Sequence, residues 1–246
     1  MDKVIANVDE AISGIKDGAV IAIPGFFSAG VPRALLSALI RSGIKGLTLA
    51  CGCGPLVGAH EELLKLIKNG QVKKLIDSYG LFRSASKGLN DPFEQAVRSG
   101  EIELEVYPMG TLAEKYRAAA AGIPAFYTPV GVGSVVEKYT LSSLIANRRP
   151  KETRIIDGKK YILEYALRPD FAFVHAYVGD REGNLRYRMT ARNFNPVMAA
   201  AAELTIAEVE NLVEPGEIQP DDVHTPGIYV KRVVQVPRPS FKVGID

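Results

Sequence analysis

The chain has 246 residues, of which 47% are hydrophobic and 24% are charged, and its formal net charge is +2. This is the composition of a globular protein that buries a substantial core, as one large domain or two small ones. The small net charge and the lack of a long Lys/Arg run argue against nucleic-acid binding, and no apolar stretch approaches the roughly 20 residues that span a bilayer. The acidic N-terminal residues and the closely spaced Cys51 and Cys53 indicate a cytoplasmic protein with reduced thiols.

The first half of the chain alternates short apolar runs with segments of helical spacing. The helical spacing predicts helices over residues 8–16, 32–41, 60–68 and 93–98. Aliphatic and β-branched runs bounded by Gly or Pro predict strands over residues 19–23, 47–50, 72–77 and 102–106. Such alternation is typical of an α/β protein, with a largely parallel sheet covered by helices.

The second half begins with a predicted helix and then changes character. Thr111 and Glu114 have the spacing of a capping box, which predicts a helix that starts there and runs to about Ala121. Asp157-Gly158 between two apolar runs predicts a β-hairpin. Further strands are expected over residues 125–128, 171–178, 185–188, 203–209 and 233–236, and a helix over 193–202. No linker divides the chain, so we expect a single domain over residues 1–236 and a C-terminal tail over 237–246.

One loop stands out in this pattern. The apolar run 19–23 ends at Pro24-Gly25, and after Phe26-Phe27-Ser28-Ala29-Gly30 a helix begins near Pro32. A strand, a glycine-hinged loop and a helix N-terminus together offer free backbone N–H groups to an anion or a developing oxyanion. On spacing alone, an ordinary turn with nothing bound is the simpler interpretation.

The residues of this loop resemble the N-terminal signature of family I coenzyme A transferases. The similar residues are Asp17, Gly18, 21–23, Gly25, Phe26, Gly30 and Pro32. Further blocks resemble, in the same order, the alpha (A) subunit of 3-oxoacid and short-chain-acid CoA transferases; they are residues 110–114, 121–129, 131–133, 180–184, 190–196, 214–216 and 224–230. The resemblance implies a largely parallel sheet with helices on both faces and a β-hairpin insertion. It also implies a hetero-oligomer with a beta (B) subunit.

The resemblance further implies covalent catalysis in which a glutamate attacks an acyl-CoA thioester and then passes CoA to an acceptor acid. The family's glutamate motif belongs to the beta subunit, and this sequence does not contain it. The chain would then supply positioning and oxyanion stabilisation, with CoA as substrate, no separate cofactor and no metal. The residues expected to line this site are Gly25, Phe26, Phe27, Ser28, Ala29, Gly30, Gly52, Cys53, Met109 and Gly110.

Three positions depart from the family pattern. Pro24 replaces a glycine, Cys53 stands where asparagine is common, and Met109 stands where glutamine is common. A thioether is a weak acceptor and does not replace an amide. These changes leave open a relative that hydrolyses a CoA ester or a C–C bond, or a non-catalytic acyl-CoA-binding scaffold. A role in fatty acid or ketone body metabolism follows only from the resemblance.

Other candidate groups have simpler explanations. The Cys51-x-Cys53 pair is too small for a metal site by itself and fits packing at a strand end. His175 lies in an apolar run and is expected to be a core histidine. The arginines at 186, 188 and 192 could contact a CoA phosphate or the partner chain, but solvated arginines on a strand are the more ordinary interpretation.

Overall fold

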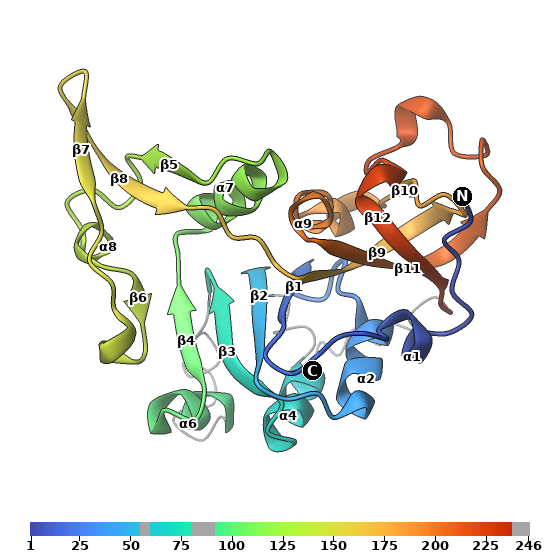
Figure 1. Ribbon diagram of the computed structural model, residues 1–246, viewed down its shortest axis with the longest axis horizontal. Helices are drawn as coiled ribbons and strands as arrows, with labels where there is room; N and C mark the ends of the chain where they lie inside the picture. Colours follow the sequence, from blue (N-terminus) through green and yellow to red (C-terminus); the bar gives the residue numbers. More distant parts are fainter. Residues whose placement is uncertain (55–59, 80–91, 238–246) are drawn as a thin grey trace.

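The computed structural model describes residues 1–54, 60–79 and 92–237. Among these residues the larger sheet has nine strands (Figure 1). They are β1 (Val20–Phe26), β2 (Leu47–Cys53), β3 (Val72–Asp77), β4 (Glu103–Val106), β6 (Leu141–Ser142), β9 (Phe171–Asp180), β10 (Leu185–Arg186), β11 (Leu204–Val213) and β12 (Val230–Gln235). Their order is β12-β11-β9-β1-β2-β3-β4-β6, with β10 paired to β9.

The strand order reverses at β1. The chain builds β1 to β4 toward one edge, then returns to place β9, β11 and β12 on the other side of β1. All seven of these strands are parallel, whereas β6 and β10 pair antiparallel. In open α/β sheets, ligands bind beyond the carboxyl ends of the strands, where the order reverses. The loop after β1 therefore occupies the position that the topology favours for a site.

Helices cover both faces of the sheet, as predicted (Figure 1). One face packs against helices from the first half of the chain, which are α1 (Val8–Ala11), α2 (Arg33–Ser42), α4 (His60–Lys68) and α6 (Pro92–Ser99). The other face packs against α7 (Met109–Ala120) and α9 (Asn195–Ala201). Adjacent residues of β1 illustrate the alternation, since Ile21 belongs to the first core and Ala22 to the second.

A second, three-stranded antiparallel sheet lies beyond α7. It consists of β5 (Ala125–Thr128), β7 (Thr153–Ile156) and β8 (Lys159–Tyr165), and the β7–β8 hairpin projects from the body of the molecule (Figure 1). Asp157 and Gly158 both have positive φ, at 50° and 74°. This is the backbone that a two-residue hairpin turn requires, so the predicted hairpin is confirmed. The short helix α8 (Val135–Lys138) lies between β5 and β6 in the chain.

Several predicted boundaries were wrong for local reasons. The first helix ends at Ala11 rather than at residue 16, and Gly14 follows with φ +86°. The predicted capping box does not form, because α7 already begins at Met109 with Pro108 as its N-cap. Thr111 consequently lies inside the first turn, where its side chain cannot cap the helix.

Two further boundaries moved. β1 continues through Pro24 to Phe26, because an irregularity in its pairing with β2 between Ile23 and Phe26 accommodates the proline. The segment 193–202, predicted as one helix, has η3 (Met189–Arg192) before it, and α9 begins only at Asn195. Most of the expected tail, residues 238–246, lies outside the described residues. Among the described helices, none combines the length and apolarity needed to cross a membrane.

Candidate active site

The loops that follow β1, β2 and β3 meet at the carboxyl edge of the sheet. Phe26 pairs with Cys53, and the rings of Phe27 and Tyr79 lie 6.5 Å apart. The backbone N–H of Gly54 donates to the Asp77 carboxylate at 3.2 Å. β4 continues the parallel order and leads into α7, so Met109 lies at this same edge. The structure thus places residues 25–30, 52–54 and 109–110 at the same edge of the sheet.

The loop after β1 is a tight turn held by its own backbone. Phe26 N–H donates to Ala29 O and Ala29 N–H donates to Phe26 O, each at 3.0 Å. Gly25 N–H donates to the side chain of Asn193, also at 3.0 Å. These three N–H groups are therefore not available to a ligand. Within the described part of the chain, Ser28 and Gly30 are the loop residues whose N–H groups have no acceptor.

Two asparagines from the second half of the chain fix this loop in place. The Asn193 amide donates to Ala29 O at 3.1 Å, and the Asn195 amide donates to Gly30 O at 3.1 Å. A Cβ at Gly30 would lie 2.5 Å from Ala191 O, so glycine is required at this contact. Residues 190–196 resemble a sequence block of the family, but the sequence alone did not place Asn193 or Asn195 in the site.

Glycine is also required at position 52, for a steric reason. A Cβ at Gly52 would lie 2.6 Å from the ring of Phe194. That ring packs edge-on against Tyr116, with the ring centroids 6.4 Å apart. The Tyr116 hydroxyl donates to Cys51 O at 2.9 Å. Helices α7 and α9 thus hold the end of β2 from one face, and Gly52 permits their close approach.

The two thiols are not activated for nucleophilic attack. Cys51 is fully buried, and burial raises its pKa well above the ordinary value. Burial also raises the pKa of Cys53, the Asp77 charge adds to this, and a hydrogen bond with Ser78 only partly opposes it. Since the thiolate is the nucleophile, neither cysteine has the environment of a catalytic thiol. Among the described residues there is also no cluster of three or more His, Cys, Asp or Glu that could hold a metal ion.

Asp77 is a functional candidate that the sequence did not reveal. It is 2% exposed at the end of β3, and its carboxylate accepts hydrogen bonds from the N–H groups of Gly54 and Ser78, the latter at 2.7 Å. Burial raises its pKa to about 6, although these hydrogen bonds act in the opposite direction. The Ser78 hydroxyl donates to Gly52 O at 2.5 Å. A buried carboxyl group therefore braces the loop that carries Cys53.

The start of α7 presents unengaged polar groups. Pro108 precedes it without any side-chain cap, and within the described part of the chain the N–H groups of Met109, Gly110 and Thr111 have no acceptor. Met109 is 51% exposed, and a Cβ at Gly110 would meet nothing within 4 Å. The Thr111 hydroxyl is buried with no hydrogen-bond partner among the described residues. A helix N-terminus with these properties can receive a negatively charged or carbonyl oxygen.

The chain thus combines a largely parallel sheet, whose strand order reverses at β1, with a glycine-hinged loop at the carboxyl edge. Residues 5–236 match the family described as Coenzyme A transferase, and the chain belongs to that family. It is similar, at 47% identity over 251 residues, to the A-type subunit of a probable succinyl-CoA:3-ketoacid coenzyme A transferase of Mycobacterium tuberculosis, with 99% of this chain and 97% of the relative covered. The A-type subunit of the 3-oxoadipate CoA-transferase of Acinetobacter baylyi is 44% identical, with 96% of each chain covered.

Solved structures share the fold. The glutaconate coenzyme A-transferase of Acidaminococcus fermentans superposes with a TM-score of 0.77 at 25% identity, over 96% of this chain and 76% of that one. A variant of the decarboxylase AibA/AibB gives a TM-score of 0.76 at 25% identity, over 100% and 88%. The acyl-CoA transferase YdiF of Escherichia coli gives 0.77 at 22% identity over 97% of this chain, which spans about half (48%) of the YdiF chain.

Proposed function

We propose that this chain is the alpha subunit of a heteromeric transferase that moves CoA from an acyl-CoA thioester to a free carboxylic acid in the cytoplasm. The observation that supports this proposal is that the 25–30 loop, the end of β2 at Gly52 and Cys53, and the open N-terminus of α7 lie at the same edge of the sheet. The names of the similar proteins, which are A-type subunits of CoA transferases, support it. CoA enters as a substrate and no resident cofactor takes part.

The chain's part in the reaction is to position the thioester and to stabilise negative charge. A glutamate of the beta subunit attacks the thioester carbonyl, and the carbonyl oxygen becomes an oxyanion. The unengaged N–H groups of Ser28 and Gly30, and those of residues 109–111 at the start of α7, are the donors that this edge offers to such an oxygen. Phe26 and Phe27, which are 47% and 40% exposed, offer apolar surface to the substrate or to the beta subunit.

The division of labour predicts that the chain is inactive by itself. Its thiols have raised pKa values, and its sequence lacks the glutamate motif. The test is to trap the CoA-thioester intermediate with borohydride in the co-purified pair and to locate the modified peptide by mass spectrometry. The label is expected on a glutamate of the beta subunit. A label on Cys53 or on any glutamate of this chain, or transfer by this chain alone, would overturn the proposal.

A second candidate, cleavage of a CoA ester or of a C–C bond, is favoured by the side chains at the site. Cys53 and Met109 provide no amide, and a decarboxylase shares the fold. A non-catalytic scaffold is the third alternative. Product analysis on the co-expressed pair separates the alternatives. Transfer gives the CoA thioester of an added acid, ester hydrolysis gives free CoA, and C–C cleavage gives a shortened acyl-CoA. A scaffold gives no product.

A further inference from the structure

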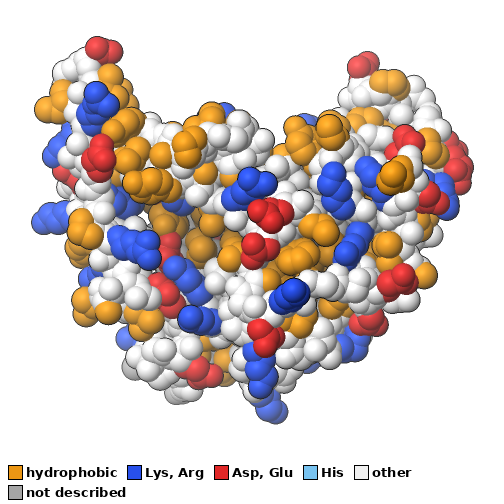
Figure 2. Space-filling view, viewed as in Figure 1, with side chains coloured by type: hydrophobic (Ala, Val, Ile, Leu, Met, Phe, Trp, Pro, Cys, Tyr) orange, Lys and Arg blue, Asp and Glu red, His pale blue; other side chains and the backbone are white. Residues whose placement is uncertain are grey.

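A polar cavity of about 770 Å³ lies between β4, α7 and β8. Its volume is in the range of small-molecule sites. Neither Cys53 nor Met109 lines it. In Figure 2, Lys and Arg side chains gather on this face between the β7–β8 hairpin and the body of the molecule. The charged residues of the lining are Lys74, Glu103, Glu105, Lys115, Arg149, Lys151, Glu152 and Glu164.

One end of the cavity holds two buried lysines around one carboxylate. The side chains of Lys115 and Lys151 are 7% and 6% exposed, and both contact Glu164, Lys115 at 3.3 Å. Both ammonium groups also lie over the ring of Tyr107, at 4.3 Å and 5.5 Å from its centroid. Each ammonium has three N–H donors, whereas within the described part of the chain Glu164 supplies the only carboxylate bonded to either. This end of the cavity therefore has unpaired N–H donors and an excess of positive charge.

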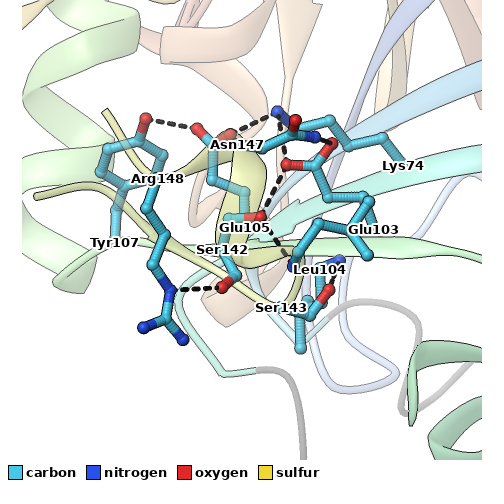
Figure 3. Close-up of polar contacts among 10 residues, drawn as sticks. Lys74, Glu103, Leu104, Glu105, Tyr107, Ser142, Ser143, Asn147 and Arg148 are labelled. Atoms are coloured by element: carbon cyan, nitrogen blue, oxygen red, sulfur yellow. Dashed lines mark hydrogen bonds and ion pairs between the residues drawn. The ribbon is translucent and has the colours of Figure 1, made fainter. Parts of the chain in front are cut away.

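The other end has the opposite arrangement, with two carboxylates around one lysine (Figure 3). Lys74 contacts Glu103 at 3.5 Å and also pairs with Glu105. Glu103 accepts further hydrogen bonds from Ser142 at 2.8 Å and Asn147 at 2.9 Å, while Glu105 accepts one from the Tyr107 hydroxyl. A carboxylate has about four lone-pair sites, so Glu105 retains acceptor capacity.

The six charged residues described at the two ends thus balance in number, three of each sign, but the positive excess lies at one end and the negative excess at the other. Tyr107 separates the two ends, because its ring contacts the lysine pair and its hydroxyl bonds to Glu105. Burial lowers the pKa of Lys115 and the neighbouring Lys151 adds to this, whereas Glu164 and, less strongly, Glu105 raise it. A further anion at this end would therefore stabilise the ammonium form of Lys115. A ligand that fits such a cavity carries a negative charge at one end and a hydrogen-bond donor at the other.

We propose that this cavity binds a small monocarboxylate, with its carboxylate against Lys115 and Lys151 and a hydroxyl or similar donor toward Glu103 and Glu105. A second carboxylate at the far end would meet two like charges and is disfavoured. The lining contains none of residues 25–30, 52–54 and 109–110, so the proposed site is distinct from the candidate active site. It places a free acid next to α7, the helix whose first turn belongs to the candidate active site.

Calorimetric titration of the full chain with 4-hydroxybutyrate tests the proposal directly. Saturable binding is expected, and succinate, which replaces the hydroxyl end by a second carboxylate, should bind at least tenfold more weakly. Lys151→Met should weaken 4-hydroxybutyrate binding by at least about tenfold, because one charge-assisted hydrogen bond is lost. Absence of saturable binding to the unmodified chain, or preference for succinate, would overturn the proposal.

Two further variants separate a built site from a general electrostatic effect. Glu164→Gln removes the carboxylate that competes for the two lysines, so it should tighten binding, and it keeps the test valid if Lys151→Met fails to fold. Lys160→Met is the matched control, because Lys160 lies on the same strand as Glu164, is 45% exposed, pairs with Glu137 and does not line the cavity. Equal weakening by Lys160→Met, or weaker binding in a folded Glu164→Gln variant, would contradict the assignment.

Discussion

The side-chain carboxylate of Glu208 accepts a hydrogen bond at 2.9 Å from the backbone N–H of Leu35, in the first turn of α2. Pro32, the N-cap residue of that helix, has no side-chain cap of its own. The other Glu208 oxygen contacts His175 Nδ1 at 2.8 Å. Burial by itself lowers the pKa of His175, but the hydrogen bonds to Glu208 and Glu210 outweigh burial, and the pKa is raised. A buried carboxylate from β11 therefore caps the helix that follows the 25–30 loop.

Glu208→Gln should destabilise the protein by about 2 kcal/mol, because hydrogen bonds to a buried charged group are lost or weakened. Urea unfolding at pH 7 measures this, and Glu203→Gln, at a side chain that is 61% exposed, is the control expected to change little. Equal stability of the Glu208→Gln variant and the unmodified protein would show that the cap contributes nothing measurable.

Asp77 should make the protein less stable as pH rises from about 4 to about 6. The folded-state pKa of about 6 exceeds the ordinary value of 3.8, so between these values the native state holds a proton that the unfolded state has released. The slope from this single group is up to about 1.4 kcal/mol per pH unit. Asp77→Asn should flatten that slope, as measured by urea unfolding at several pH values. An identical pH dependence in the two proteins would refute the assignment.

Gly52→Ala should lower stability by about 1–3 kcal/mol, the usual range for overpacking. The added methyl group would lie 2.6 Å from the Phe194 ring, which Tyr116 contacts edge-on. Gly110→Ala is the matched control, because its Cβ has open space and alanine favours the helix. Thermal unfolding of Gly52→Ala, Phe194→Leu and the double variant should show partial rescue, and strictly additive losses would exclude a direct clash.

Met109→Gln should change turnover or the ranking of acyl substrates in the co-expressed pair, with little change in melting temperature. Met109 is the first residue of α7 and is 51% exposed, so the substitution disturbs little packing. One hydrogen bond to a developing oxyanion is worth up to about 10²–10³ in rate. Met109→Leu, which adds no amide, is the control. If the two variants behave alike with every acid tested, Met109 only fills space.

The sequence was sufficient for the fold class and for most elements, because each has a local signal. The helix His60–Lys68 and the strands Val72–Asp77 and Ala125–Thr128 lie where periodicity predicted them, with the same bounds. The capping box at Thr111 was wrong because the local rule competes with Pro108, whose fixed φ also suits a helix start. An element can be predicted from its local pattern where that pattern and the tertiary structure favour the same boundary, and is mispredicted where they favour different ones.

The candidate site was only partly predictable for a different reason. The glycines of the 25–30 loop and Gly52 were singled out through resemblance, but the side chains that hold them come from far along the chain. Asn193 reaches Gly25 across 168 residues, and Glu208 reaches Leu35 across 173 residues. No periodicity or spacing rule joins such positions. Asp77 could have been found by noting that an acid follows the apolar pair Leu75-Ile76 at the end of a strand.

The position of β1 between β2 and β9 has a consequence for biosynthesis. β1 can pair with β2 soon after both are synthesised. The other edge of β1 stays unpaired until Phe171 and Ala172 of β9 are synthesised, about 150 residues later. At about 5–20 residues per second, translation of that interval takes about 8–30 seconds. During this time a strand destined for the interior is an exposed edge, and the loop that follows it has none of its asparagine anchors. The nascent chain is therefore most vulnerable to mispairing just before β9 emerges from the ribosome.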